Sequence, residues 1–230
     1  MPRIARVVIP GVPHHVTQRG NRRLKTFFGV RDFLEYKKHL ADMCRRFAVE
    51  IWAYCLMSNH VHFIACPETE EGLHLAYQET HKRYTRYLNF RKHWRGHVWQ
   101  SRFSSFPMDE AHLLRAARYI ERNPVNSGMV ADPGDYPWSS VSAHLKGTDD
   151  DLVKVAPLLE LVGSWDDFLK TPLTAAEIEK LELHERTGRP LGSNSFLKQL
   201  EQKTGRRFRL ERPGRKPQKP TSYLGSGPQT

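Results

Sequence analysis

Hydrophobic positions along the first half of the chain switch between a helical and a strand period. Apolar residues at helical spacing predict a helix over residues 32–47. The runs VEIWAYCLM (49–57) and HVHFIAC (60–66) are rich in β-branched and aromatic residues, and only the polar pair Ser58-Asn59 separates them. Two such runs joined by so short a polar segment predict a β-hairpin.

The remaining elements of this half follow from the same patterns. Residues 6–20 predict an interrupted strand that leads into a basic turn, 71–91 a long helix and 97–108 a further strand. Asp109 can N-cap a following helix that Pro124 ends. The order strand, helix, hairpin, helix, strand, helix predicts an α+β fold, an antiparallel sheet with helices packed on it.

The composition changes after residue 147. Residues 149–185 are acidic, and Thr174 and Glu177 form a capping-box pattern at the start of a predicted helix. A short helix is expected over 195–203, before a basic tail rich in Pro, Gly and Ser that we expect to be disordered when free. We therefore divide the chain into a main domain (1–147), an acidic helical extension (148–204) and a tail (205–230).

Length and composition fit a globular, cytoplasmic protein. The 230 residues are 39% hydrophobic, enough for a sizeable core, and no apolar run approaches the roughly 20 residues of a membrane span. The N-terminus lacks the apolar core of a signal peptide. Cys44, Cys55 and Cys66 are odd in number and form no CxxC pair, so we expect buried thiols rather than disulfides or a cysteine-bound zinc.

The net charge of +11 indicates a polyanionic partner. Residues 81–102 contain seven Lys and Arg, no acid, and five interleaved Tyr, Phe and Trp. Cations can neutralise phosphates while aromatic rings stack on unpaired bases, so the segment favours single-stranded nucleic acid. The alternative is a solvated helix face whose aromatic side chains turn inward.

Two groups of polar residues are candidates for a catalytic site. His60 and His62 lie two apart in a predicted strand and so share one face, where they could hold one metal ion. With 12 histidines in the chain, this spacing alone is weak evidence. On the helix from 109 to 123, an apolar stripe of Leu, Ala and Ile faces the sheet. Another side of this helix carries residues suited to line a phosphate site: Arg115, Tyr119, Arg122 and Asn123.

Four motifs together resemble a known family. His60-Val61-His62 is similar to the HUH motif of single-strand DNA endonucleases. The segments PHHVTQRGNRR, MSNHVHFI, VWQSRF and RYIERNPVNSGMV occur in the order and spacing of the REP-associated tyrosine transposases. The resemblance spans residues 6–144. It implies a ferredoxin-like or RRM-like HUH nuclease domain followed by a basic C-terminal extension.

The resemblance also implies roles for individual residues. His60 and His62 would bind a divalent metal, Mg²⁺ or Mn²⁺, with Asn123 in the position of a third ligand, and Tyr119 would be the nucleophile. The family acts on repetitive extragenic palindromes, short DNA hairpins with a single-stranded tag. We therefore expect a single-strand DNA endonuclease and strand transferase that forms a 5′-phosphotyrosine, and without a P-loop we expect no nucleotide cofactor. The residues expected to contact DNA are Arg19, Asn21, Arg22, Arg23, Lys82, Arg83, Arg86, Arg95, Arg102, Arg115 and Arg122.

Other interpretations of the same residues remain open. The chain could be a noncatalytic RRM-like module that binds hairpin DNA or RNA, with the histidines stacking on bases. A zinc hydrolase is less favoured, because no third His or acidic ligand follows at helical spacing. His14 or His15 could also bind metal directly, and Tyr119 could be a buried structural phenol.

Overall fold

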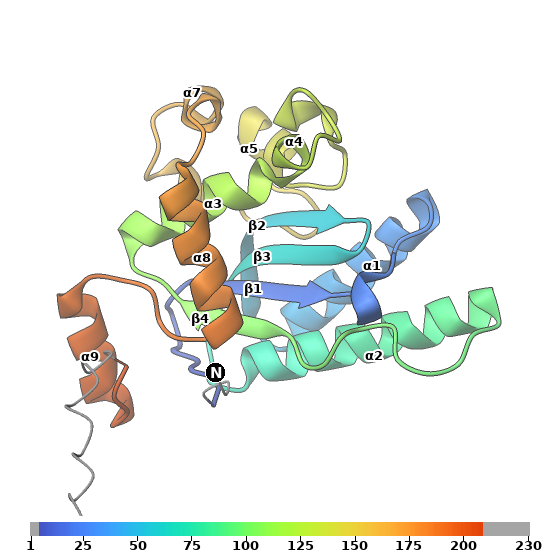
Figure 1. Cartoon of the computed structure of the whole chain (residues 1–230), viewed down its shortest axis with the longest axis horizontal. Helices are drawn as coiled ribbons and strands as arrows, with labels where there is room; N and C mark the ends of the chain where they lie inside the picture. The colour runs from blue at the N-terminus through green and yellow to red at the C-terminus, as the bar shows by residue number, and fades with distance from the viewer. Residues whose placement is uncertain (1–4, 209–230) are drawn as a thin grey trace, which may run out of the picture.

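Four antiparallel strands form the centre of the fold (Figure 1). The computed structural model describes residues 5–208. The strands are β1 (His14–Arg19), β2 (Val49–Met57), β3 (His60–Pro67) and β4 (Ser104–Pro107), and their order across the sheet is β2-β3-β1-β4. The predicted α+β class with an antiparallel sheet is confirmed.

The hairpin is formed by β2 and β3, as predicted. Met57 pairs with His60 across the two-residue turn, and the register holds back to Cys55 opposite His62. In antiparallel strands, directly opposed residues point to the same side of the sheet. The turn therefore fixes the face on which both histidines lie.

The edge strand β4 is shorter than the predicted strand over 97–108. Only Ser104–Pro107 pairs with β1 as a strand, opposite His14–Thr17, although β1 itself continues to Arg19. Before Ser104 the chain stays near the end of β1 through a bridge between Gly20 and Trp99 and through hydrogen bonds from Gln100 N–H to Arg19 O and from Asn21 N–H to Val98 O. Residues 97–103 therefore lie beside the end of β1 without extending the β4 ladder.

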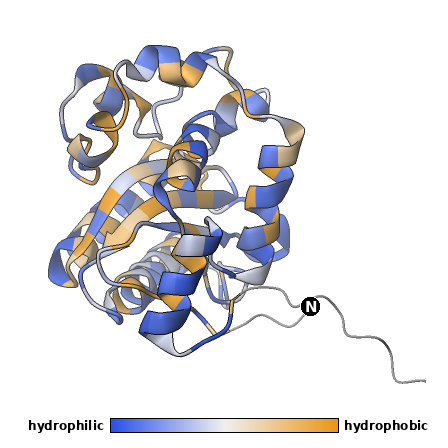
Figure 2. Cartoon of the chain, turned by 90° about the vertical axis from the view of Figure 1, so that its left-hand side faces the viewer, coloured by the Kyte–Doolittle hydropathy of each residue, from blue (hydrophilic) through white to orange (hydrophobic). Residues whose placement is uncertain are grey.

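Two long helices cover one face of the sheet. They are α1 (Val30–Arg46) and α2 (Gly72–Lys92), both close to their predicted bounds. Their apolar sides meet the sheet in a core that includes Tyr36, Leu40, Phe63, Tyr77 and Tyr84, all fully buried. Figure 2 shows apolar strands between helices whose outward sides are hydrophilic.

The opposite face of the sheet is covered by α3 (Glu110–Glu121) and α8 (Ala175–Thr187). Asp109 caps α3 by accepting a hydrogen bond from His112 N–H, as expected. The predicted stripe of Leu113, Ala117 and Ile120 is buried against this face. The helix ends at Glu121, and Pro124 lies in the following short helix α4 (Asn123–Asn126) rather than at the end of α3.

The residues after 130 form further helices; α8 and α7 (Trp165–Lys170) pack on the same core as α3, whereas α9 (Asn194–Thr204) packs with Val7 and Ile9 in a separate hydrophobic cluster. The capping box of Thr174 and Glu177 at the start of α8 is present, which confirms that prediction. The other elements here are η2 (Pro133–Asp135), α5 (Val141–Lys146) and α6 (Ala156–Leu159). The division into three parts stays a prediction, and most of the predicted tail lies outside the described residues.

Two composition-based expectations can be compared with the fold. Cys44, Cys55 and Cys66 are buried free thiols, as predicted. Within the described part of the chain, no helix combines the length and apolar character that crossing a membrane requires.

Candidate active site

Polar side chains gather on the face of the sheet that α3 and α8 cover. In the register of β1 and β3, Thr17 lies opposite His62 and Arg19 opposite His60. Because side chains alternate along a strand, His15 shares this face with them. Three residues of β1 and two of β3 thus form one continuous polar surface beneath α3.

His60 and His62 lie side by side, with ring centroids 4.9 Å apart and nearly perpendicular planes. The His60 ring is held by Asn59, whose Oδ1 is 2.6 Å from His60 Nδ1. Burial lowers the pKa of His60 to about 4, with a further contribution from the charge of Arg19. Burial also lowers the pKa of His62 well below its usual value. Both rings are therefore neutral near pH 7, the form that binds a metal.

His15 lies directly behind His62. Its Nε2 is 3.1 Å from His62 Nδ1, and the two rings stack with centroids 5.4 Å apart. His14, the next residue along β1, points to the other face, where it contacts Val12 O and accepts a hydrogen bond from Ile9 N–H. Of these two histidines, only His15 contacts an expected metal ligand, and that ligand is His62.

Tyr119 and Asn123 approach the histidines from the helical layer. The Tyr119 ring lies 5.6 Å from that of His62 and 6.2 Å from that of His15. The buried Asn123 side chain hydrogen-bonds to His60. The structure thus brings together the four residues to which the sequence assigned catalytic or metal-binding roles.

The Tyr119 phenol is partly buried, and burial raises its pKa to about 12. The negative charges of Glu185 and Glu182 add to this effect, while Arg19 opposes it. A tyrosine that acts as a nucleophile must lose its proton. Arg19 is the nearby residue whose charge favours that step, and the two glutamates disfavour it.

Helix α8 contributes a residue that the sequence did not indicate. Glu185 hydrogen-bonds to Thr17, and burial raises the pKa of its carboxyl. Ser104 on β4 donates a hydrogen bond to the Glu185 backbone oxygen, which fixes this turn of the helix above the sheet. Residue 185 is far from the motifs in sequence, so no spacing rule could place it here.

The predicted basic turn follows β1 and begins at Gly20. A side chain at Gly20 would collide with Leu24 O, 2.2 Å from an added Cβ, so only glycine fits. Arg22 and Arg23 follow with φ angles of 53° and 61°, a conformation that is costly for residues other than glycine. Asn21, Arg22 and Arg23 are all exposed, close to the Arg19 end of the site.

Two of the predicted DNA-contacting residues face away from the histidines. Arg115 donates a hydrogen bond to Glu177 on α8, 2.9 Å away, and Arg122 donates one to Leu169 O on α7. Both guanidinium groups therefore hold the C-terminal helices onto α3. The expectation that they line a phosphate site beside Tyr119 finds no support in this geometry.

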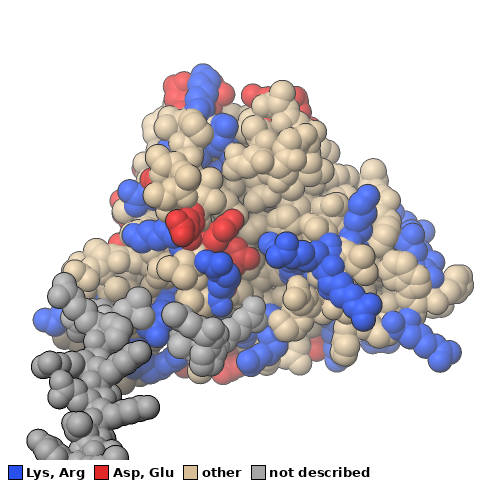
Figure 3. Space-filling model, in the orientation of Figure 1, with Lys and Arg blue, Asp and Glu red and all other residues tan. Residues whose placement is uncertain are grey.

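The other predicted cations lie on α2 and on the chain that follows it. Figure 3 shows Lys and Arg side chains gathered over α2 and the segment before β4, with a separate acidic cluster over α8. The interleaved aromatic residues divide into two groups. Tyr84 and Trp99 are buried in the core, whereas Phe90 and Trp94 are exposed. The residues of this region that the sequence predicted to contact DNA are Lys82, Arg83, Arg86, Arg95 and Arg102.

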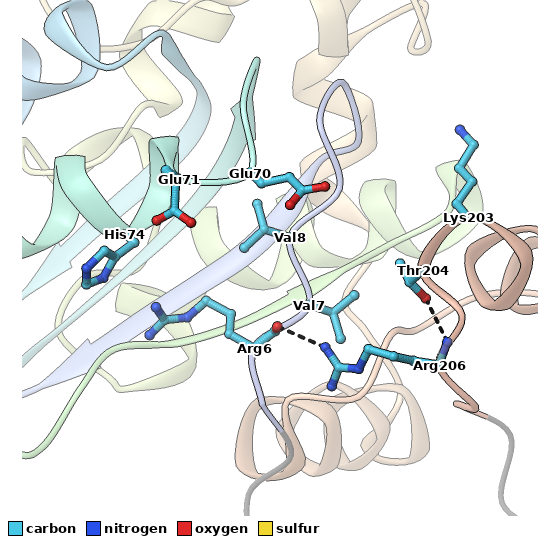
Figure 4. A pocket seen from close by; sticks show the side chains of 9 residues that line it. All are labelled: Arg6, Val7, Val8, Glu70, Glu71, His74, Lys203, Thr204 and Arg206. Atoms are coloured by element: carbon cyan, nitrogen blue, oxygen red, sulfur yellow. Dashed lines mark hydrogen bonds between the residues drawn. The ribbon is translucent and has the colours of Figure 1, made fainter.

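A cavity of ≈ 450 Å³ lies apart from the histidines, between the N-terminal segment, the start of α2 and the end of α9 (Figure 4). Its charges are mixed, because Glu70 and Glu71 face the same space as Arg6 and Lys203. Arg206 closes one side by donating a hydrogen bond to the Arg6 backbone oxygen. The cavity thus marks where the C-terminal helix meets the N-terminal segment.

The donor groups of the site suit a divalent cation. His60 and His62 supply neutral imidazoles and Asn123 an amide oxygen, a set that Mn²⁺ or Mg²⁺ can complete with water. Among residues 5–208 no group of three or more His, Cys, Asp and Glu is placed to hold a metal. A metal here would therefore depend on two histidines, the amide and solvent or substrate oxygens.

The part of the chain that carries this fold and these residues matches a family of transposases. Residues 10–123, which contain His60, His62, Tyr119 and Asn123, match the family model described as "Transposase IS200 like". The chain belongs to this IS200-like transposase family.

The fold is also similar to solved structures. One is a REP-associated tyrosine transposase bound to a REP hairpin, with a TM-score of 0.56 and 22% identity over 66% of this chain and 90% of that one. Another, from Deinococcus radiodurans R1 and assigned as a transposase, has a TM-score of 0.37 and 19% identity over 53% of this chain and 97% of that one. No curated protein matches the chain.

Proposed function

We propose that this transposase is a metal-dependent single-strand DNA endonuclease and strand transferase that acts on REP-like hairpins through a covalent 5′-phosphotyrosine. The observation that carries the proposal is the position of Tyr119. Its ring lies 5.6 Å from that of His62, on the same face as His60 and next to Asn123. A phenol beside two neutral imidazoles and an amide is the arrangement that metal-assisted attack on a phosphodiester requires.

His60, His62 and Asn123 are the residues that would hold the cation. When bound, a divalent ion supplies Lewis acidity to the scissile phosphate and stabilises negative charge as it develops there. The protein orients these ligands from three directions. β3 positions the histidines, the β2–β3 turn fixes His60 through Asn59, and the start of α4 places Asn123.

The covalent step exchanges one phosphoester bond for another. The Tyr119 phenolate oxygen attacks phosphorus, the bond from phosphorus to the 3′ oxygen breaks, and that oxygen leaves as a 3′-hydroxyl after taking up a proton. Because the new tyrosyl ester keeps the bond energy, a 3′-hydroxyl can later reverse the reaction without ATP. Arg19 favours the phenolate and faces the same site, which suits it to contact the phosphate.

The REP hairpin is proposed as the DNA partner for two reasons. The fold is similar to that of a transposase solved with a REP hairpin, and exposed cations lie both in the turn 21–23 and on α2. The turn 21–23 lies beside the site, where a single-stranded tag would enter. The cations of α2 lie on the other side of the sheet, where they can contact a duplex stem.

The test is incubation of the full-length protein with labelled REP-like hairpins that carry a single-stranded tag, in the presence of Mn²⁺, followed by denaturing electrophoresis. We expect a covalent protein–DNA band that maps to Tyr119 by mass spectrometry and that does not form when EDTA is present from the start. An adduct on another tyrosine would overturn the assignment of Tyr119. Tight hairpin binding without any adduct or cleaved strand would instead favour a noncatalytic binding module.

A further inference from the structure

The tip of the β2–β3 hairpin contacts the basic turn that follows β1, at one end of the sheet (Figure 1). Asn59 O accepts a hydrogen bond from Gly20 N–H, 2.8 Å away, and Ser58 O accepts two more from the backbone N–H groups of residues 26–27. The basic turn therefore lies against the hairpin tip, and the next residue of the hairpin is His60, an expected metal ligand.

The side chain of Asn59 joins this turn to His60. Its Nδ2 donates a hydrogen bond to Arg23 O, 3.1 Å away, and its Oδ1 lies 2.6 Å from His60 Nδ1. One amide group thus contacts a backbone carbonyl of the turn on one side and the imidazole of the expected metal ligand on the other.

These two contacts decide where the hydrogens lie. A carbonyl oxygen can only accept, so the NH₂ group of the Asn59 amide faces Arg23 O and its oxygen faces His60. An amide oxygen can also only accept, so the hydrogen of the neutral His60 ring must be on Nδ1, which leaves the lone pair of Nε2 for a metal ion. If the amide turned over, two oxygens would meet at Arg23, and the ring hydrogen would move to Nε2 and block the metal.

The turn itself is held in a strained conformation. Arg22 and Arg23 both have φ angles in the left-handed region, 53° and 61°. Residues other than glycine stay there only when surrounding contacts hold them. The hydrogen bond from Asn59 is made to the second of these two residues, so the conformation of the turn and the orientation of the amide depend on each other.

We propose that Asn59 is a positioning residue that holds the hydrogen of His60 on Nδ1 and transmits the conformation of the turn 21–23 to this metal ligand. A metal ion on Nε2 makes Nδ1–H a stronger donor, which strengthens the chain of hydrogen bonds through the amide to Arg23 O. The coupling is reciprocal, so a turn held in place also favours metal binding. DNA that contacts the turn would act on His60 in the same way, a consequence that rests on the proposed function.

The first experiment is ¹⁵N NMR of the histidine rings in the metal-free protein. Wild-type His60 should carry its hydrogen on Nδ1, and Asn59→Asp should keep it there, because a carboxylate oxygen still accepts. Asn59→Ala should lose this preference. Asn89→Ala is the matched control, since Asn89 Nδ2 also donates to a backbone carbonyl, Gly96 O, in a different turn; its His60 signals should be those of the wild type. A His60 hydrogen on Nε2 in the wild type, or wild-type signals in Asn59→Ala, would overturn the proposal.

A change in the turn should reach His60 through the amide alone. In Gly20→Ala the added Cβ would lie 2.2 Å from Leu24 O, so the turn must move and the His60 signals should shift. In the Asn59→Ala background the same substitution should cause no further shift, because the connection is already lost. Equal shifts in both backgrounds would show that the turn acts on His60 by another route and would refute the role of Asn59.

The second experiment measures the reverse coupling by limited digestion with trypsin, which cleaves after Arg22 and Arg23 when the turn opens. Mn²⁺ should slow this cleavage about threefold or more in the wild type, as expected when one hydrogen bond of the turn is strengthened. Asn59→Asp cannot donate to Arg23 O, so its turn should be cleaved faster and Mn²⁺ should not protect it. Cleavage after Arg95, exposed in another loop, should not respond to Mn²⁺. Equal protection of the turn in Asn59→Asp and the wild type would contradict the coupling.

Calorimetric titration with Mn²⁺ completes the comparison. Asn59→Ala should bind Mn²⁺ about 10- to 100-fold more weakly, whereas Asn59→Asp, which keeps the acceptor for Nδ1–H, should stay within about threefold of the wild type. Wild-type affinity in Asn59→Ala would reject the positioning role. A wild type with its His60 hydrogen on Nδ1 that binds no Mn²⁺, or forms no Tyr119 adduct, would reject the proposed function alone. A normal adduct with the His60 hydrogen on Nε2 would reject the role of Asn59 alone.

Discussion

Replacing His15 by Phe tests how the metal ligands are held. His15 Nε2 lies 3.1 Å from His62 Nδ1, and both residues are buried. For His62 Nε2 to bind a metal, the ring hydrogen must be on Nδ1, which then donates to His15 Nε2. Phe keeps a ring in the stack with His62 but removes the acceptor. We therefore expect His15→Phe to weaken metal binding while the packing against the His62 ring is kept.

The size of the effect follows from the type of hydrogen bond that is lost. A hydrogen bond to a ring that carries partial positive charge from a bound cation contributes about 1.5–3 kcal/mol. This corresponds to a loss in metal affinity of about 10- to 100-fold, the usual range for the partner of a ligating histidine. The free energy of unfolding should change by only about 1 kcal/mol or so, because the variant also removes His15 Nδ1, a buried atom that has no partner in the described structure.

The assay is a titration of the DNA-free protein with Mn²⁺, in which binding is measured both by calorimetry and by the EPR signal of free Mn²⁺. His15→Gln should recover most of the affinity, since its amide can present an acceptor near the position of Nε2. His14→Phe is the matched control, a buried histidine on the same strand with two hydrogen bonds on the other face. It should lower the free energy of unfolding by about 2 kcal/mol and leave Mn²⁺ affinity unchanged.

Two results would refute this reasoning. Wild-type Mn²⁺ affinity in His15→Phe would show that the contact does not orient His62. A loss of affinity in His14→Phe as large as in His15→Phe would show that general loosening of β1, not the hydrogen bond, controls the site. In the wild type, ¹⁵N NMR of the His62 ring should find its hydrogen on Nδ1 both before and after metal is added.

Four further predictions follow from the site and the core. Tyr119→Phe should keep metal and hairpin binding but form no covalent adduct in mass spectrometry; cleavage at the wild-type rate would reject Tyr119 as nucleophile. Alanine at His60 or His62 should abolish cleavage while hairpin affinity in a gel-shift assay stays within about threefold, because affinity is spread over many cations. Burial lowers the pKa of His81 to about 3, so the unfolded chain takes up a proton below pH 6.5 that the folded chain does not, and the free energy of unfolding falls as pH falls. Near pH 5, His81→Phe should therefore reduce the slope of the free energy of unfolding against pH by about 1.4 kcal/mol per pH unit, measured by urea titration at several pH values. Trp165→Phe should cost about 1.5–3 kcal/mol in the same assay, because Glu121 Oε2 loses a donor 2.7 Å away; an unchanged midpoint would contradict this.

The sequence predicted the elements best where one physical signal dominated. The β2–β3 hairpin and helices α1 and α2 have strong periods and clear ends, and the structure places them within about two residues of the predicted bounds. The strand over 97–108 was predicted too long, because its ladder with β1 stops at the pair of Thr17 and Ser104 although β1 continues to Arg19. The length of a strand depends on its pairing with a neighbour, which no pattern within residues 97–108 reports.

The sequence predicted only those relations within the site that join residues close to each other along the chain. Period-two spacing placed His60 and His62 on one face, and one helical turn separated Tyr119 from Asn123. The pairing of His15 with His62 depends on the register between β1 and β3, which brings residues 47 positions apart into contact. Glu185 depends on the packing of a helix from outside the matched family region. Long-range register and helix docking were therefore the missing information.

The end of α3 shows why the C-terminal helices matter to the site. Glu121, its last residue, lies between Tyr119 and Asn123 in sequence and is fully buried. A buried carboxylate is costly unless donors surround it. Its donors are Ser140 Oγ, His144 Nδ1 and Trp165 Nε1, all outside the matched region 10–123. A chain cut after residue 147 would lose the Trp165 donor and expose the core that α7 and α8 cover, so the extension is needed to hold the tyrosine helix in place.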